Sequence, residues 1–176
     1  EPDFFSDKRQ MKLENAPLFQ SPPLLPLDVD RVIVIAPHPD DETFGCGGTV
    51  AQLRAEGAEG RVVVVTDGSK GDPEGNTEDV IAVRKKELHA SLEILGVSEV
   101  SFLAQEDGNC WGGERLLGLL KGEIEAFRPE WILAPSPLDY HRDHLAVALS
   151  VIECWHSLGE QERLFLYEVW TPLPAT

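Results

Sequence analysis

Continuous apolar runs alternate with segments of helical periodicity along most of the chain. Residues 31–36 and 60–65 are apolar and β-branched almost throughout, which is typical of strands buried on both faces of a sheet. Similar but less regular runs follow at residues 99–103, 131–134 and 164–167. Between these runs, apolar residues recur at helical spacing. This spacing predicts helices over residues 49–56, 77–95, 116–127 and 145–155.

The predicted helices carry further signals. Gly96 directly follows the second of them and marks its C-terminal end. In the last helix, one face collects five apolar residues, which are Leu145, Ala148, Leu149, Ile152 and Trp155. Alternating strands and helices predict βαβ units with right-handed crossovers. The fold class we expect is therefore α/β, a Rossmann-like doubly wound and mostly parallel sheet with helices on both faces.

The first thirty residues have a different pattern. Residues 3–15 are polar and highly charged, and four prolines between Pro17 and Pro26 interrupt any periodicity. We expect residues 1–30 to form an extended, proline-rich N-terminal arm. Residues 31–176 are expected to form a single catalytic Rossmann-like domain.

Charge and cysteine content narrow the functional classes. The chain of 176 residues has 15 basic and 31 acidic side chains, a formal net charge of −16. Such a surface disfavours binding to nucleic acids and to anionic lipids, and no apolar run approaches the roughly 20 residues of a membrane span. Cys46, Cys110 and Cys154 are far apart and form no zinc-binding pair. We interpret them as free thiols and expect a cytoplasmic protein.

A cluster of potential metal ligands directly follows the first strand. In the segment A-P-H-P-D-D-E, residues 36–42, one histidine lies between two prolines and three carboxylates follow the second proline. His38 and Asp41 are three residues apart, so a tight turn can direct both side chains at one point. The carboxylates would repel one another without a cation, which points to a metal site.

A second cluster follows the fourth strand. The segment P-L-D-Y-H-R-D-H, residues 137–144, again places two histidines, His141 and His144, three residues apart. In a Rossmann-like order, strands one and four are neighbours where the winding reverses, and ligands bind there outside the carboxyl ends of the strands. This placement predicts a site with histidine, aspartate and histidine ligands and one open position. Zn²⁺ accepts that set in catalytic sites, and Fe²⁺ or Mn²⁺ would also accept it.

These two motifs carry a resemblance to a known family. The segment P-H-P-D-D-E-T-F-G-C-G-G, followed further along the chain by H-R-D-H, closely resembles the LmbE-like (PIG-L) zinc deacetylases, the N-acetylglucosaminylphosphatidylinositol de-N-acetylase-like family. Three shorter segments are also similar to the family, namely R-K-K-E-L from Arg84, Leu95-Gly96 and Asp107-Gly108. The resemblance covers residues 31–170 and rests on specific motifs in the right order.

The resemblance implies a zinc-dependent hydrolase that removes the N-acetyl group from an amino-sugar-containing small molecule. Carried onto this sequence, it makes His38, Asp41 and His144 the metal ligands. It also implies Asp40 as the general base and His141 as the cationic stabiliser of the oxyanion, oriented by Asp143. It further implies two substrate-binding residues, which are Arg84 and Asp107.

The implied chemistry is self-consistent. Bound zinc lowers the pKa of a water from about 15.7 to about 7 and polarises a carbonyl. A carboxylate beside a ligand, as Asp40 would be, can take the proton of the water and later give it to the leaving amine. A preorganised donor at His141 would face the developing oxyanion, where such donors contribute roughly 3–4 kcal/mol in other hydrolases.

Other interpretations remain open. A metal-binding or nucleotide-binding module without turnover would use the same fold, and the glycines at positions 45, 47 and 48 imitate a dinucleotide loop. The neighbouring carboxylates would repel a pyrophosphate, so we interpret these glycines as a tight turn that allows close helix–sheet contact. Arg84 has an alternative partner in Glu87, one helical turn away. A metallophosphoesterase is the third alternative.

The end of the chain bears on assembly. Family members usually continue beyond the equivalent of Thr176, so we expect the chain to be C-terminally truncated relative to the family or part of a longer product. A sheet that ends here leaves an exposed edge, which favours a homo-oligomer. The expected partner in catalysis is a small-molecule N-acylated amino sugar, with no nucleic acid and no membrane.

Overall fold

The structure is a computed structural model that describes residues 28–72, 74–75 and 79–170. All of them belong to one compact unit, Asp28–Leu173. The arm predicted at residues 1–30 falls almost entirely outside the described residues, so that expectation stays a prediction. Within the described part of the chain, no helix is long and apolar enough to cross a membrane.

Five parallel strands form a single sheet in the order β3-β2-β1-β4-β5. Their bounds are β1 Arg31–Ala36, β2 Glu59–Thr66, β3 Glu99–Gln105, β4 Trp131–Pro135 and β5 Arg163–Tyr167. In the central strand, Val34 is in register with Val62 of β2 and Leu133 of β4. The predicted fold class is confirmed, as is the placement of the first and fourth strands side by side. That adjacency brings the two histidine-containing segments to one edge of the sheet.

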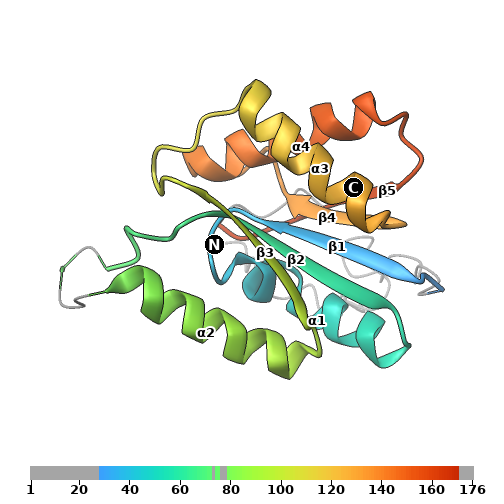
Figure 1. Ribbon diagram of the computed structural model, residues 1–176, viewed down its shortest axis with the longest axis horizontal. Coiled ribbons are helices and arrows are strands. Elements are labelled where there is room, and N and C mark those ends of the chain that lie inside the picture. The colour runs from blue at the N-terminus through green and yellow to red at the C-terminus, as the bar shows by residue number, and fades with distance from the viewer. Residues whose placement is uncertain (1–27, 73, 76–78, 171–176) are drawn as a thin grey trace, which may run out of the picture. The chain divides into compact units, whose positions relative to one another are not determined.

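Helices cover both faces of the sheet. Helices α1 (Asp41–Ala55) and α2 (Val80–Leu95) lie on one face, and α3 (Glu114–Phe127) and α4 (Arg142–Ser157) lie on the other (Figure 1). On the α3/α4 side, Ile33 and Ile35 of β1 join the buried cluster with Leu120 and Val151. The alternate residues Val32 and Val34 are equally buried and point to the α1/α2 side, because successive strand side chains face opposite ways. Burial on both faces explains the unbroken apolar runs in the sequence.

Helix α1 begins earlier than predicted. The expected start was residue 49, whereas the helix begins at Asp41 and includes the glycines at positions 45, 47 and 48. The interpretation of these glycines as a turn is therefore wrong, but the close contact expected of them exists. A Cβ on Gly45 would lie 2.2 Å from Cδ2 of Tyr167, whose hydroxyl donates to the carbonyl of Ile35 at 2.8 Å. Gly45 thus lets α1 pack against the ring of a buried tyrosine.

Helix α4 buries a different face from the one predicted. Leu145 and Leu149 were expected to face the core, but they are 40% and 53% exposed. The buried positions are instead Asp143, His144, Val147, Ala148, Ser150, Val151 and Cys154. Turning the helix in this way directs Asp143 and His144 toward the edge of the sheet where the first motif lies. The same face buries Val147, Val151 and Cys154 in the hydrophobic core, so one orientation of the helix serves both the core and the site.

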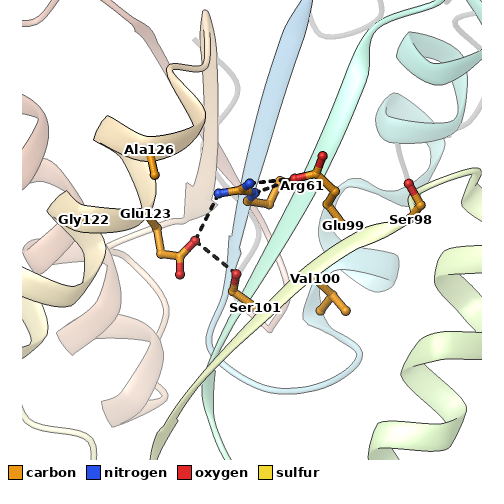
Figure 2. A pocket seen from close by; sticks show the side chains of 8 residues that line it. All are labelled: Arg61, Ser98, Glu99, Val100, Ser101, Gly122, Glu123 and Ala126. Atoms are coloured by element: carbon orange, nitrogen blue, oxygen red, sulfur yellow. Dashed lines mark hydrogen bonds and ion pairs between the residues drawn. The ribbon is translucent and has the colours of Figure 1, made fainter.

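At the amino ends of the strands, a polar hollow of about 380 Å³ is lined by an ion-pair network. Arg61 of β2 lies between Glu99 and Glu123, with Nη2–Oε2 and Nη1–Oε2 distances of 2.6 and 3.4 Å (Figure 2). Ser101 also donates to Glu123 at 3.1 Å. The charged groups of this hollow pair with one another, and we assign it a structural role.

Candidate metal centre and active site

Four loops meet at the carboxyl ends of the strands. The loop after β1 carries His38 and Asp40 and leads into α1 at Asp41. The loop after β4 carries Asp139 and His141 and leads into α4, whose first turn holds Asp143 and His144. The loops after β2 and β3 close the sides of the site. Segments from distant parts of the chain converge because parallel strands all end at this edge.

Three potential ligand atoms form a nearly equilateral triangle. Nδ1 of His38 lies 3.1 Å from Oδ2 of Asp41 and 3.2 Å from Nε2 of His144. The third side, between Nε2 of His144 and Oδ2 of Asp41, is 3.1 Å. Zinc bonds of about 2.0–2.1 Å at tetrahedral angles place neighbouring ligands about 3.3 Å apart. The donor set and its spacing therefore fit a tetrahedral metal with a fourth position left for substrate or water.

The orientation of His144 supports the same conclusion. Its ring is fully buried, and Nδ1 lies 3.1 Å from Oδ2 of Asp139. A carboxylate at this distance fixes the proton on Nδ1 and leaves the lone pair of Nε2 facing His38 and Asp41. Histidine ligands of metals are commonly held in this way by a carboxylate. Asp139 is thus placed to orient the ligand.

His38 is held in the same manner from its other nitrogen. Nε2 lies 3.1 Å from Oδ2 of Asp143 and 3.2 Å from Oδ1 of Asp107, so that nitrogen carries a proton and Nδ1 is directed at the candidate metal position. Asp143 also accepts from the backbone N–H groups of Gly108 and Cys110, at 2.6 and 3.2 Å. The two carboxylates link the β3 loop to the first motif.

The charged groups packed around the candidate ligands shift the pKa values of His38 and Asp41. Burial by itself would lower the pKa of His38, but hydrogen bonds to Asp107, Asp143 and Asp41 outweigh it and raise the pKa to about 11. Burial would raise the pKa of Asp41, but hydrogen bonds to His144 and His38 outweigh it and lower the pKa. Both directions describe the site with protonated histidine nitrogens facing Asp41, and a bound metal would displace these protons.

Asp40 is close to the ligands but belongs to a different set of contacts. Its carboxylate is 47% exposed and accepts from Nη2 of Arg84 at 3.0 Å. Burial raises the pKa of Asp40, against the opposing charge of Arg84, which makes this carboxylate a stronger base than usual. Asp40 therefore lies beside the candidate ligands and is open to solvent.

Arg84 contacts the catalytic loops and not its own helix. Its guanidinium donates to the carbonyls of Gly68 and Pro39 at 3.2 and 3.1 Å, so the alternative pairing with Glu87 is not what the structure has. A Cβ on Gly68 would lie 2.9 Å from Nη1 of Arg84, and φ at this glycine is +68°. Both the space and the left-handed backbone require glycine here.

His141 lies beside the ligands, but Asp143 does not hold it as expected. Its ring is edge-on to His38, with centroids 4.9 Å apart, and its ligand atom is within 4.8 Å of those of His38 and His144. Nδ1 of His141 is buried and has no hydrogen-bond partner among the described residues. The difference arises because Asp143 is engaged by His38 and two backbone groups. Burial and the charges of His38 and His144 lower the pKa of His141.

A polar cavity of about 280 Å³ opens above these groups. It is lined by His38, Asp40, Asp41, Lys70, Gly71, Arg84, Asp107, Gly108, His141 and Trp170. Two of the side chains that line it, those of Lys70 and Trp170, were not named as site residues from the sequence. Trp170 is 60% exposed, and its backbone N–H donates to Asp139 at 3.3 Å. No local pattern marks either residue, because each reaches the site only through the packing of distant loops.

Asp139 could have been found in the sequence. It lies within the second motif, five residues before His144, and a carboxylate so close to a ligand histidine is a common orienting partner. Its other oxygen accepts from the backbone N–H of His141 at 3.0 Å. One buried carboxylate thus fixes both histidines of the motif.

Comparison with known proteins identifies the family of this chain. Residues 33–155 match the family described as GlcNAc-PI de-N-acetylase, PIG-L. The chain is 34% identical over 122 residues to a diacetylchitobiose deacetylase of Thermococcus kodakarensis, covering 66% of this chain and 46% of that protein.

Two solved structures extend the comparison. The N,N′-diacetylchitobiose deacetylase of Pyrococcus horikoshii, complexed with its inhibitor MPG, superposes with a TM-score of 0.72 at 27% identity, covering 83% of this chain and 63% of that one. GalB of Pseudomonas putida KT2440, a 4-carboxy-2-hydroxymuconate hydratase, superposes with a TM-score of 0.65 at 26% identity, covering 71% and 55%. The chain therefore spans about half to two thirds of the length of these relatives.

Proposed function

We propose that this chain, which belongs to the GlcNAc-PI de-N-acetylase (PIG-L) family, carries the catalytic centre of a zinc-dependent deacetylase acting on an N-acetylated amino sugar. One observation supports the proposal above all. Three donor atoms at mutual distances of 3.1–3.2 Å lie beside a carboxylate that is not part of the triangle and is open to solvent. Such an arrangement suits metal-assisted hydrolysis of an amide.

His38, Asp41 and His144 would hold the metal. When bound, the metal supplies a lowered water pKa and polarisation of the amide carbonyl. Asp139 and the pair Asp107 and Asp143 orient the two imidazoles from behind, through the contacts described above. These six carboxylates and histidines would form the binding shell of the centre.

Asp40 would act as general base and then as general acid. It takes a proton from the water whose oxygen attacks the acetyl carbonyl carbon. When the C–N bond breaks, Asp40 returns that proton to the leaving amine nitrogen. Acetate and the free amino sugar are the products, and Asp40 is again ionised for the next turnover.

His141 would stabilise the negative charge on the carbonyl oxygen. Its ring lines the cavity next to the ligands, where a hydrogen-bond donor meets the oxygen as its charge develops. Burial and the charges of His38 and His144 lower the pKa of His141 in the metal-free site. The charge on the oxyanion then raises the proton affinity of the ring as the reaction proceeds.

Acetate release and metal content test the proposal together. Chelator-free protein is analysed for metals by mass spectrometry, then assayed for acetate release from N,N′-diacetylchitobiose and from a panel of N-acetylglucosamine conjugates. We expect about one zinc per chain, lost in Asp41→Ala and His144→Ala, and activity that depends on it. Metal binding without acetate release from any substrate would favour a non-catalytic binding module.

The structural similarity to GalB favours a second candidate, a hydratase. Both reactions consume a water, but a hydratase adds the water across a carbon–carbon double bond and breaks no C–N bond. Assaying an unsaturated polycarboxylate by loss of its ultraviolet absorbance separates the two. Activity there, with no acetate from amino sugars, would replace the deacetylase assignment.

We also propose a cytoplasmic location and self-association. The three cysteines are free and buried, which suits a reducing compartment.

Strand β5 is at an edge of the sheet, and edge strands are commonly covered by another chain. Size-exclusion chromatography with light scattering tests the second proposal, which a monomeric mass at micromolar concentration would contradict.

A further inference from the structure

We propose that Glu42, a buried carboxylate with no part in the mechanism above, is a positioning residue that holds Asp40 in its catalytic conformation, with helix α2 bracing both residues. This inference rests on the proposed deacetylase function. It concerns how the general base is held and not how the metal is bound.

Glu42 is fully buried in the first turn of α1. Oε2 accepts the backbone N–H of Asp40 at 3.1 Å, an N–H that the carbonyl of His38 also accepts at 3.0 Å. Oε1 accepts the hydroxyl of Thr43 at 2.6 Å. Within the described part of the chain, no lysine or arginine forms an ion pair with it. Burying a carboxylate that is held only by neutral donors costs folding free energy. This cost is understandable if Glu42 positions a neighbouring group.

The backbone of Asp40 is strained and requires support from its neighbours. Its φ is +150° and its ψ is −23°, a conformation that L-residues rarely adopt and that persists only where the surroundings enforce it. Asp40 is the N-cap of α1 but makes no side-chain cap hydrogen bond. An N-cap aspartate usually turns its own carboxylate back onto the helix. Here Glu42 accepts the backbone N–H, and the carboxylate of Asp40 is directed elsewhere.

Helix α2 holds both members of this pair. Ser91 and Arg84 are seven residues apart on α2, which is two turns, so they project from the same face. Oγ of Ser91 lies 3.2 Å from Oε1 of Glu42. Nη2 of Arg84 lies 3.0 Å from Oδ2 of Asp40. One helix therefore braces the backbone of the proposed base through Glu42 and its side chain through Arg84.

Two substitutions of Glu42 differ in whether they can still accept a hydrogen bond from Asp40. Glu42→Met keeps the length of the side chain but removes its oxygen acceptor, so the backbone N–H of Asp40 is left with the carbonyl of His38 alone. Glu42→Gln can present its amide oxygen to that N–H, while its NH₂ group donates to the hydroxyl oxygens of Thr43 and Ser91. Every polar group is then satisfied. Gln is therefore expected to rescue what Met loses.

Kinetics and hydrogen exchange of the metal-loaded chain test the inference. For Glu42→Met we expect kcat on N,N′-diacetylchitobiose, or on the best substrate of the panel, to fall about tenfold to a hundredfold. KM and metal content should stay at parental values. Amide exchange in peptides spanning residues 36–44 should become faster. Glu42→Gln should restore both kcat and slow exchange.

Two further variants keep the result interpretable. Val50→Ala removes buried volume from the same helix, at a position 1% exposed, and should lower Tm while leaving kcat and exchange at residues 36–44 unchanged. Ser91→Ala is a milder perturbation in case Glu42→Met does not fold, and it should lower kcat by about threefold.

The outcomes are distinguishable. If the parent chain releases acetate but Glu42→Met keeps its kcat and its slow exchange, the inference is overturned and the proposed function stands. Equal losses of kcat in Glu42→Gln and Glu42→Met would also overturn it. If the parent chain releases no acetate from any substrate, the proposed function fails. Faster exchange in Glu42→Met would then still support the structural part, and unchanged exchange would overturn it.

Discussion

Asp139 offers the sharpest prediction about the metal centre. Its carboxylate is 4% exposed, and Oδ2 lies 3.1 Å from Nδ1 of His144, the candidate ligand. Removing it in Asp139→Ala leaves that Nδ1–H without its partner and frees the ring to rotate or to exchange tautomers. The ligand nitrogen then spends less time facing His38 and Asp41.

The size of the effect follows from this geometry. Loss of an orienting partner behind a histidine ligand typically weakens metal affinity about 10- to 100-fold, which is about 1.4–2.8 kcal/mol. Since Asp139 also fixes the backbone of His141, we expect Asp139→Ala at the upper end of this range. Asp139→Asn keeps a neutral acceptor for Nδ1–H and should lie at the lower end.

The measurement is a zinc dissociation constant by competition with a chromophoric chelator. Asp79→Ala provides a matched control, because Asp79 is also a carboxylate at the start of a helix, where it accepts from Ala82 at 3.0 Å. It should cost about 1 kcal/mol of stability without changing zinc affinity. Equal zinc affinity in Asp139→Ala and the parent chain would refute the reasoning.

Three further predictions follow from the site and its support. Asp40→Asn should lower kcat by about 10²- to 10⁴-fold at unchanged metal content; acetate release with metal analysis measures this, and a retained kcat would exclude Asp40 as the base. Trp170→Ala should raise KM for amino-sugar substrates about threefold to tenfold with kcat retained, since this exposed ring lines the cavity; an unchanged KM would place the indole outside the substrate path. Gly45→Ala should destabilise the fold by about 1–3 kcal/mol, because the new Cβ would lie 2.2 Å from the ring of Tyr167. Gly48→Ala, with nothing within 4 Å of the new Cβ, should instead stabilise it by up to about 1 kcal/mol; thermal unfolding compares the pair, and equal Tm shifts would contradict the packing argument.

Arg84 illustrates how a substrate role and a positioning role can be confused in a sequence. The resemblance to the family suggests a contact with the sugar, and Arg84 does line the cavity. Its guanidinium, however, is already bound to Asp40 and to two carbonyls of the neighbouring loops. Asp107 is similar, since its oxygens accept from His38 and from the backbone N–H of Lys70. For both residues, holding the catalytic groups explains the contacts that are present, and a direct contact with substrate stays a prediction.

The sequence by itself determined the fold class and the location of the site. Unbroken β-branched runs such as residues 31–36 are stable only when both faces are buried, and their alternation with helices leaves a parallel sheet as the solution. A parallel sheet ends all these strands at one edge, and the Rossmann-like order expected from the sequence makes β1 and β4 neighbours there, as the structure has them. Two motifs rich in histidine and aspartate at those loops therefore indicated the site, and membership of the family is confirmed.

Only the tertiary structure decided which face of α4 is buried and which carboxylate holds which histidine. Apolar periodicity favoured Leu145 and Leu149 as core residues, but the helix turns so that Asp143 and His144 reach the site. Asp143 was expected to orient His141 and instead contacts His38, because the β3 loop brings Gly108 and Cys110 to the same carboxylate. A sequence shows which ionisable groups are available. Several carboxylates lie near each histidine, and differences of about an ångström decide which of them forms the hydrogen bond. Only the packing of distant loops sets those distances.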